Sequence, residues 1–438
     1  MAFARMLLSM MTTKQKETFP SPEAAGRTKS PRALLAGILR DVLPQLRHTG
    51  SFLILLTAFL VLLSCGPAPS GTPSGATVYS GSTYSLLGPT ALVSVGSVPW
   101  YANATGNTLV GLVPDTGFEL SGYAPVTISN PLSTFTTTYD LSDPVAMAVD
   151  LSGNLWVASQ KNNSIVSLDS CFTGSNPNYN SCSVTGYQKN LDIPSGVAAD
   201  PSGNIWVANQ GNNTLLVLSV TTCTYSCPSS DYSPSYDGTS YSPTLYCLSG
   251  SSCTPMGSGC VLSSPSAIAS DSNGNIWVIN SSPASLTEIV SGNASTCRTF
   301  TASELSLDNP VALATDTSGD LAIVNQGTKG SDSGSVVYLP SGCTPGSCSP
   351  VVLSGASLGV SQPVSATFAQ NGDLWVAEAG NNSATDMPSG CLSGGACQPI
   401  VYAGSAYPFG TPTSILAIGS TIWVLGASAL VSITPSGP

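Results

Sequence analysis

Histidine is almost absent from this chain, which has one His among its 438 residues. Histidine is the side chain that titrates near neutral pH, and it is the commonest metal ligand. Its scarcity argues against most histidine-based catalysis and most histidine-ligated metal sites. The one exception, His48, precedes residue 65, so the rest of the chain has none.

Charged residues are also scarce, at 8 % of the chain, and the net charge is −11 with a pI near 4.3. A chain with 12 basic residues lacks the material for the basic patch that nucleic-acid binding requires. The hydrophobic share of 42 % is too high for a disordered polyelectrolyte. We therefore expect a secreted, polar-surfaced all-β protein that binds no nucleic acid.

The apolar run Phe52–Leu63 has 12 residues, which suits the core of a secretory signal (about 7–15) but not a spanning helix (about 20). Before residue 65 the chain has eight basic and three acidic residues, a net charge of +5. From residue 65 onward it has four basic and 20 acidic residues, a net charge of −16. This order of a basic segment, an apolar core and small residues predicts an export signal.

The segment Leu62-Leu63-Ser64-Cys65-Gly66 resembles the lipobox of bacterial lipoproteins. The resemblance implies that Cys65 is lipidated and becomes the mature N-terminus. We expect a leader over residues 1–64, a Gly/Pro/Ser tether over 65–75, and membrane contact through the lipid anchor alone. The expected location is the outer membrane or cell surface. The alternative is an ordinary cleavable signal and a secreted or periplasmic protein.

A repeat organises the chain after the tether. Each unit has a Pro, then Asp-x-x-Gly-Asn or a variant of it, then a Trp 11 or 12 residues after the Pro, and several units continue with Asn-Asn. Every Trp of the chain falls on this repeat position: Trp100, Trp156, Trp206, Trp277, Trp375 and Trp423, with Ala322 in the equivalent place of one copy.

One unit predicts four strands, a to d. Pro opens strand a, Asp-x-x-Gly-Asn forms a tight turn, and strand b carries the Trp between neighbouring sheets. Strand c follows Asn-Asn, and a variable tract supplies strand d. The steps between aromatic positions, 45 to 71 residues, are typical of propeller blades with insertions.

The number of blades follows from closure. The last copy ends after its strand c, whereas residues 76–86 precede the first copy as a spare strand. Pairing the two would close the ring without open edges. We therefore predict a seven-bladed β-propeller over residues 76–438. The alternative is a six-bladed ring with residues 76–141 as an N-terminal addition.

Thirteen cysteines less Cys65 leave twelve, and no C-x-x-C metal knuckle is present. In an exported chain an even number of cysteines at short spacings predicts disulfides rather than a metal–thiolate site. The repeat register predicts pairs between strands c and d. The copy with Trp206 has a long insertion, for which we expect two nested pairs, and one further pair is left by elimination. The expected pairs are Cys171–Cys182, Cys343–Cys348, Cys391–Cys397, Cys223–Cys253, Cys227–Cys247 and Cys260–Cys297.

The repeat unit, best preserved around Pro194–Asn213, resembles the NHL-type propeller repeat and is similar to repeats of the streptogramin (virginiamycin B) lyase group. The resemblance implies a propeller whose relatives include lyases, lactonases and pure binding modules. The lyases use a catalytic His, and peptide-processing lyases use His-bound zinc. The chain after residue 65 has no His, so neither chemistry carries over.

Candidate ligand-binding residues stand three positions after each Trp position, where strand b ends. They should ring one face of the propeller, opposite the face of the Asp turns and the Cys hairpins. The alternative is that these residues cap local turns. The candidates are Asn103, Ser159, Asn209, Asn280, Asn325 and Glu378, with Gly426 in the seventh copy.

The turn aspartates Asp150, Asp200, Asp271 and Asp316 lie in different repeats. A calcium site needs 6–8 converging oxygens, so turn formation is the better interpretation. We expect no metal and no cofactor.

Two function classes remain. The first is a monomeric binding module at the cell envelope, whose propeller face holds a protein or glycan partner by hydrogen bonds. The second is a His-independent lactonase- or lyase-like enzyme, with a metal held by Glu378 and neighbouring Asn side chains.

Overall fold

The computed structural model describes residues 75–114, 123–130, 132–133, 138–169, 171–172, 182–222, 239–250, 252–328, 333–395 and 397–435. All of them belong to one unit of the chain, residues 72–438. The expected leader, most of the tether and Cys65 lie outside the described residues.

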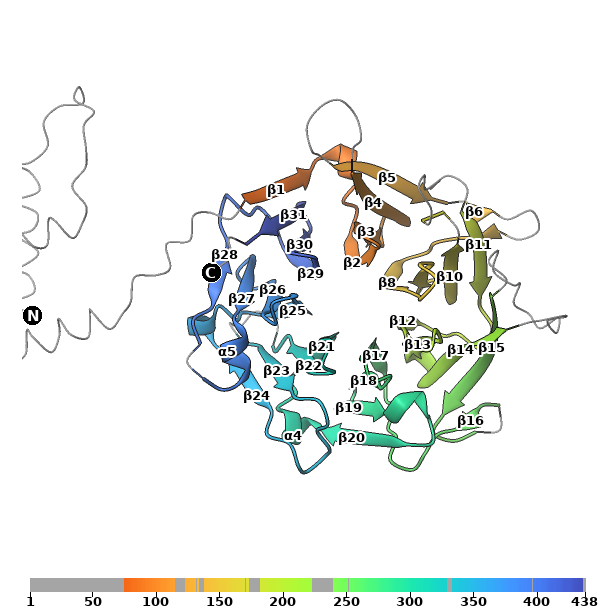
Figure 1. Ribbon diagram of the computed structural model, residues 1–438. Helices are drawn as coiled ribbons and strands as arrows, with labels where there is room; N and C mark the ends of the chain where they lie inside the picture. The colour runs from red at the N-terminus through yellow and green to blue at the C-terminus, as the bar shows by residue number, and fades with distance from the viewer. Residues whose placement is uncertain are drawn as a thin grey trace, which may run out of the picture. The chain divides into compact units, whose positions relative to one another are not determined.

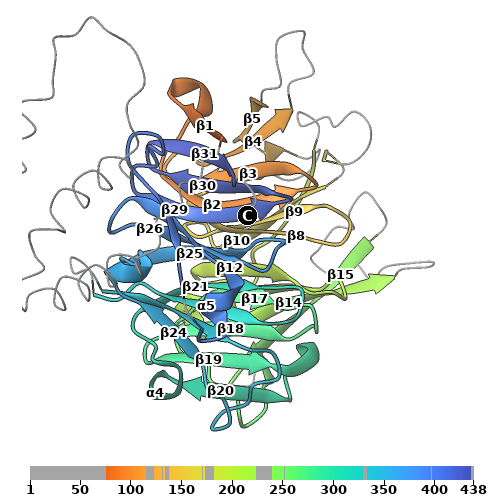
Figure 2. The same cartoon turned by 60° about the vertical axis from the view of Figure 1, so that its left-hand side comes forward.

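The described residues form seven sheets of at least four strands, arranged as the blades of a β-propeller (Figures 1 and 2). Each blade runs from its innermost strand, a, to its outermost strand, d. Blade 1 is β2–β5 (Pro89–Val95, Val98–Asn103, Thr108–Pro114, Tyr123–Ser129), blade 2 is β8–β11 (Pro144–Val149, Leu155–Ser159, Ser164–Asp169, Ser183–Tyr187), and blade 3 is β12–β15 (Pro194–Ala199, Ile205–Asn209, Thr214–Thr222, Thr239–Cys247). Blade 4 is β17–β20 (Pro265–Ser270, Ile276–Ser281, Ala284–Ile289, Cys297–Thr301), and blade 5 is β21–β24 (Pro310–Thr315, Leu321–Asn325, Ser335–Leu339, Val351–Ser354). Blade 6 is β25–β28 (Pro363–Phe368, Leu374–Glu378, Ser383–Met387, Ile400–Tyr402), and blade 7 is β29–β31 (Pro412–Ile418, Thr421–Gly426, Ala429–Thr434) with β1 (Gly75–Ser80).

The first described strand closes the ring. β1 pairs antiparallel with β31, from Gly75 opposite Thr434 to Ser80 opposite Ala429. Figure 1 shows these two ends of the described chain side by side. The prediction of seven blades is confirmed, and the six-bladed alternative is wrong because β2–β5 form a full blade.

Additional elements decorate the blades. A short fifth strand, β16 (Thr254–Pro255), pairs parallel with β15, and β6 (Leu132–Ser133) pairs with β7 (Thr138–Tyr139) between blades 1 and 2. The helices of the described residues include α4 (Ala302–Leu305) and α5 (Ser389–Leu392). None of the helices in this part of the chain is long and apolar enough to cross a membrane.

The tryptophans fill the seams between blades, as the repeat predicts. Trp206, for example, packs with Ile276 and Val278 of the next blade, and its side chain is 2 % exposed. Burying so large a side chain between sheets supplies much of the apolar contact that holds neighbouring blades together.

The seam between blades 5 and 6 lacks a Trp, because Ala322 occupies the position. Tyr338 stands directly opposite Ala322 on the neighbouring strand and packs into the same seam. In blade 2 the residue opposite Trp156 is Ser167, and in blade 7 the residue opposite Trp423 is Ser432. In these three blades a large residue on one of the two strands stands opposite a small one on the other, whereas Trp206, Trp277 and Trp375 stand opposite Val217, Glu288 and Asp386.

The turn aspartates close the a–b turns. Oδ1 of Asp200 accepts hydrogen bonds from the backbone N–H groups of Ser202 and Asn204, at 2.9 Å each. Gly203 adopts the left-handed conformation that the turn requires, at φ 86°. Asp150, Asp271 and Asp316 accept the same pair of backbone bonds in their own blades. Within the described residues no group of three or more His, Cys, Asp or Glu side chains is placed to hold a metal ion.

The described residues include five disulfide bonds. Four are the expected pairs Cys171–Cys182, Cys260–Cys297, Cys343–Cys348 and Cys391–Cys397. The fifth joins Cys247 to Cys253, which corrects the expected pairs Cys223–Cys253 and Cys227–Cys247. The chain turns back after β15 so that β16 pairs with it, and this brings Cys253 to a neighbour six residues away. Cys223 and Cys227 lie outside the described residues.

Candidate functional site

Two sets of connections separate the two faces of the propeller, as the sequence predicts. On one face the a–b and c–d turns meet, for example where the N–H of Ser291 donates to Asn275 Oδ1 at 2.9 Å. On the other face the b–c turns meet the d–a loops, where the N–H of Gln210 donates to the carbonyl of Ile193 at 3.1 Å. The candidate residues at the ends of strands b lie on this second face.

The candidate side chains are buried and do not face solvent. Asn209 is fully buried, and its Oδ1 accepts a 2.6 Å bond from the N–H of Asp192. Its Nδ2 donates to the carbonyl of Asn190 at 2.9 Å and to Thr214 Oγ1 at 2.9 Å. The amide therefore ties strand b to the d–a loop of its own blade.

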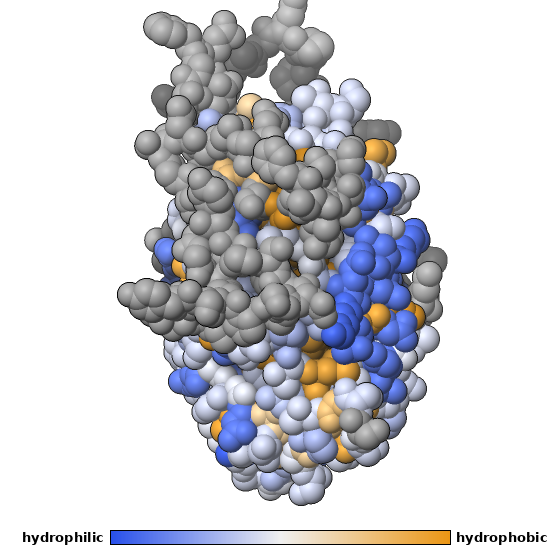
Figure 3. Space-filling model, turned by 90° about the vertical axis from the view of Figure 1, so that its right-hand side faces the viewer, coloured by the Kyte–Doolittle hydropathy of each residue, from blue (hydrophilic) through white to orange (hydrophobic). Residues whose placement is uncertain are grey.

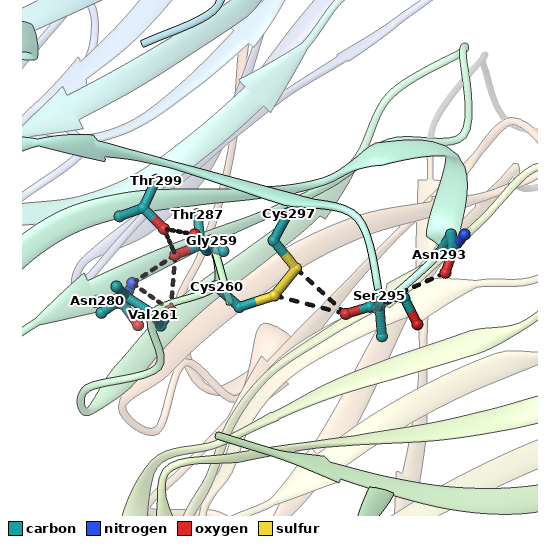
Figure 4. The surroundings of a disulfide bond; sticks show 10 residues. Gly259, Cys260, Val261, Asn280, Thr287, Asn293, Ser295, Cys297 and Thr299 are labelled. Atoms are coloured by element: carbon teal, nitrogen blue, oxygen red, sulfur yellow. Dashed lines mark hydrogen bonds between the residues drawn. A yellow bond between two sulfur atoms is a disulfide. The ribbon is translucent and has the colours of Figure 1, made fainter. Parts of the chain in front are cut away.

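The other asparagines at this position are also fully buried, and each forms hydrogen bonds with the d–a loop of its own blade. Asn280 accepts from the N–H of Ser263 and donates to the carbonyl of Val261, at 2.9 and 3.2 Å. Figure 4 shows the bond from Asn280 to Val261 beside the Cys260–Cys297 disulfide, with Thr287 and Thr299 also holding the loop. Asn103 binds Leu87 N–H and the Ser85 carbonyl, and Asn325 binds Asp308 N–H and the Ser306 carbonyl.

Three blades depart from asparagine. Ser159 is fully buried, and its Oγ has no hydrogen-bond partner among the described residues. At Gly426 a Cβ atom would stand 2.0 Å from the carbonyl oxygen of Phe409, so the d–a backbone fills the place of a side chain. Glu378 is fully buried; Oε2 accepts a 2.8 Å bond from the N–H of Ser361, and burial raises its pKa to about 8.

The expectation of an open polar ring at these positions is therefore wrong. These side chains are covered, and in the Asn blades their hydrogen-bonding capacity is spent on the protein's own loops. The turn-capping alternative is nearer to the structure, although the loop that is held lies about 17 residues earlier in sequence rather than in the adjacent turn.

The Asn-Asn pairs also have structural roles. Asn212 donates to the carbonyl of Asn190 at 3.3 Å and accepts from Thr214 Oγ1 at 2.5 Å. Asn213 accepts a 2.6 Å bond from the N–H of Ser264 in the next blade. Asn163 accepts likewise from Ile193, at 2.9 Å. The second Asn of each of these pairs therefore links consecutive blades.

What this face does expose is a set of amides in blades 2 and 3. We name it the amide surface; it consists of Gln160, Gln188, Asn190, Gln210, Asn212 and Asn213, all exposed or half-buried. The bonds from Asn212 to Asn190 and from Ile193 to Asn163 make it continuous across the two blades. Figure 3 views the molecule from the side on which blades 2 and 3 lie in Figure 1, and it shows hydrophilic residues gathered on the right of the view.

The side chains of Gln188, Asn190 and Gln210 make no hydrogen bond within the described part of the chain, so their donors and acceptors are available. Each amide offers both a donor and an acceptor. The same connections in blades 1, 4 and 7 carry Ala104-Thr105-Gly106, Ser281-Ser282-Pro283 and Ala427-Ser428 instead. Further amides lie in the same connections of other blades, Asn107 in blade 1, Asn309 and Gln326 in blade 5, and Gln362, Asn381 and Asn382 in blade 6. Blades 2 and 3 therefore carry the largest share of the amides on this face, but not all of them.

Little net charge accompanies the amide surface. Lys161 pairs with Asp143 at 3.4 Å, and its side chain is 69 % exposed, so the pair is largely screened by solvent. Lys189 and Asp192 lie on the neighbouring d–a loop. The sequence signal for this surface was the run of amides in Gln188-Lys189-Asn190 and in Asn209–Asn213. Turn formation alone explains such a run equally well, so the signal did not single out a surface.

The fold is that of a seven-bladed propeller with an NHL-type repeat. The family model for the NHL repeat matches residues 191–218, which span strands a to c of blade 3. No curated protein matches the chain in a sequence search.

Solved structures similar to this chain share its fold at low sequence identity. A streptogramin B lyase is 15 % identical with a TM-score of 0.56, over 83 % of this chain and 98 % of that one. A catalytically inactive virginiamycin B lyase from Staphylococcus aureus, solved with quinupristin, is 16 % identical with a TM-score of 0.57, over 82 % and 99 %. The extracellular domain of a protein described as a hybrid two component system from B. thetaiotaomicron is 16 % identical with a TM-score of 0.52, over 82 % and 42 %. At such identity the likeness establishes the fold and leaves the activity open.

Proposed function

We propose that this protein is an exported binding module that holds a neutral, hydroxyl-rich glycan on its amide surface. The observation that carries the proposal is the set of exposed amides, Gln188, Asn190 and Gln210, with unused hydrogen-bonding capacity. Sugar hydroxyls both donate and accept, so they match side-chain amides group for group. Loops on a rigid scaffold are also where binding residues concentrate.

Export is part of the proposal. Five disulfides in the described residues suit an oxidising compartment, and one propeller of similar fold is an extracellular domain. Lipidation at Cys65 would keep the propeller at the cell envelope. Mass spectrometry of the N-terminal peptide tests the anchor, and an unmodified Cys65 or a different mature start would contradict it.

The enzyme alternative has less support. It needs the Glu378 carboxylate on the propeller face, where it could hold a metal with neighbouring Asn side chains. Glu378 is fully buried, and the asparagines at the equivalent positions of other blades are occupied by their own d–a loops. Among the described residues, no group of three or more His, Cys, Asp or Glu side chains is placed to hold a metal ion.

The binding proposal is tested by presenting the mature protein to an array of neutral and charged glycans, followed by titration of the best ligand. The triple variant Q188A/N190A/Q210A should weaken the Kd by more than tenfold, because each lost hydrogen bond contributes about 1 kcal/mol. The control variant N273A/N371A removes two exposed amides from a–b turns on the opposite face. Binding of charged glycans only, or equal weakening in both variants, would contradict the proposal.

A further inference from the structure

In the blades that have an asparagine at the end of strand b, the side-chain amide of that asparagine holds the d–a loop through one acceptor and one donor. In blades 3, 4 and 5 the side-chain oxygen accepts from a backbone N–H 17 residues earlier, and the side-chain nitrogen donates to a carbonyl 19 residues earlier. An amide supplies both functions, whereas an ionised carboxylate is an acceptor only.

Glu378 reproduces the acceptor half of this pattern. Its Oε2 accepts from the N–H of Ser361, 17 residues earlier. The carbonyl 19 residues earlier belongs to Gly359, whose backbone packs against Thr385: a Cβ on Gly359 would stand 3.0 Å from Thr385 Oγ1. In blade 4 the residue equivalent to Thr385 is Thr287, which receives the Asn280 amide at 3.1 Å and donates to Val261 at 2.7 Å.

The donor half is missing if Glu378 is ionised. Among the described residues Glu378 Oε1, Ser361 Oγ and Thr385 Oγ1 are buried without hydrogen-bond partners. The hydroxyls of Ser361 and Thr385 could donate to a carboxylate, but only a proton on Oε1 gives Glu378 the donor that the asparagines supply. That donor would reach toward Thr385 Oγ1 or the Gly359 carbonyl, which otherwise accepts from Asn381 Nδ2 at 3.3 Å.

We propose that Glu378 is a neutral carboxylic acid in the folded protein, with its proton on Oε1 in place of the asparagine amide N–H. Ionisation of Glu378 then removes the donor and loosens the d–a loop of blade 6 around Gly359 and Ser361. This makes the d–a loop of blade 6 sensitive to pH, on the same face as the amide surface.

The electrostatic surroundings agree with a neutral acid. Burial raises the pKa of Glu378 to about 8, and the bond from Ser361 lowers it by less. The neighbouring strands β25 and β29, the loop 355–362 and the turn 379–382 carry no Asp, Glu, Lys or Arg. The other titratable groups on strands of this part of the ring are Asp386 on β27, Tyr338 on β23 and Tyr402 on β28. Tyr338 donates to Asp320 and Asp386 interacts with Asp373, so both lie toward the a–b turns of the opposite face. Lys329 and Asp332, in the connection before β23, lie outside the described residues.

The test compares the wild type with E378Q, whose amide donates at every pH. Because the folded-state pKa lies above that of the unfolded chain, wild-type stability should fall as pH rises from about 4.5 to about 8 and then level off. The decrease in Tm between these pH values should be no more than half as large in E378Q as in the wild type. Amide hydrogen exchange at Ser361, corrected for intrinsic rate, should accelerate at least tenfold between pH 6 and pH 9 in the wild type but not in E378Q.

A direct readout does not depend on the variant folding. Difference infrared spectroscopy or carbon NMR of Glu-labelled wild-type protein should show one protonated carboxyl at pH 6.5 that ionises near pH 8. D386N is the matched control, because it removes the other buried acid of blade 6 and should leave this signal in place. Fully ionised glutamates at pH 6.5, or an unchanged pH dependence in E378Q, would overturn the proposal. So would a stabilisation by Na⁺ or Ca²⁺ at pH 9 that E378Q abolishes, since it would place a cation among these oxygens.

Discussion

Asp200 accepts a 2.9 Å hydrogen bond from the indole Nε1 of Trp206 across the a–b turn of blade 3. The same bond joins Asp150 to Trp156 and Asp271 to Trp277. One carboxylate oxygen closes the turn through two backbone N–H groups, and the other fixes the tryptophan that fills the seam to the next blade. Local turn formation and contact between blades are therefore coupled through a single side chain.

This coupling predicts unequal costs for one substitution made in two blades. D200A leaves the buried indole donor of Trp206 unpaired and opens the turn, so it should lower the free energy of unfolding by about 2–3 kcal/mol. D316A removes an equivalent turn in blade 5, where no Trp follows, and should cost about half as much. Urea denaturation monitors both variants, and equal losses would show that the indole bond contributes nothing.

The pairing of Ala322 with Tyr338 predicts a compensating double variant. A322W should overpack the seam between blades 5 and 6 and cost about 1–3 kcal/mol, while Y338S should leave a void at a similar cost. The double variant A322W/Y338S recreates the Trp–Ser pair of blades 2 and 7. It should be more stable than the sum of the single losses by more than about 1 kcal/mol. If the losses of the two single variants were additive in the double variant, residues 322 and 338 would not compensate for each other and the prediction would be wrong.

Counting cysteines predicts one further bond. The five bonds of the described residues use ten of the 13 cysteines, which leaves Cys65, Cys223 and Cys227. If Cys65 is lipidated, Cys223 and Cys227 are left to pair with each other. Non-reducing peptide mapping should find this short loop together with Cys247–Cys253. Recovery of Cys227 linked to Cys247, as the sequence register suggested, would contradict both.

Asp386 predicts a second pH-dependent contribution in blade 6. It is 7 % exposed, and burial, followed by the nearby Asp373, raises its pKa to about 7. The folded state therefore holds the proton more tightly than the unfolded state, and stability should fall as pH rises from about 4 to about 7. D386N should reduce the dependence of stability on pH between about 4 and 7, whereas E378Q should reduce it up to about pH 8. Thermal unfolding of both variants across pH separates the two, and a D386N profile parallel to that of the wild type would exclude the Asp386 contribution.

The sequence was sufficient for the repeat because the Pro-to-Trp spacing is local and each unit repeats it. The closure of blade 7 by β1 was also predictable, since one unit lacked a strand and a spare strand preceded the first. The roles of Asn209 and Glu378 were not predictable, because each depends on a loop 17 residues earlier whose path no local pattern records. The Cys247–Cys253 pair was missed because it depends on β16 turning back onto β15.

The contacts between blades lead to the last prediction. Asn213 adopts the left-handed conformation, at φ 55°, and its Oδ1 accepts a 2.6 Å bond from the N–H of Ser264 in blade 4. N213G keeps the backbone conformation without strain but loses the acceptor, so it should lower the free energy of unfolding by about 1 kcal/mol. N213D keeps the acceptor and should stay within about 0.5 kcal/mol of the wild type. The matched control is N382G: Asn382 has the same φ of 55° in blade 6, but its side chain makes no hydrogen bond within the described residues. Denaturation midpoints for the three variants decide the matter, because equal losses in N213G and N382G would assign the effect to the turn itself and not to the bond between blades.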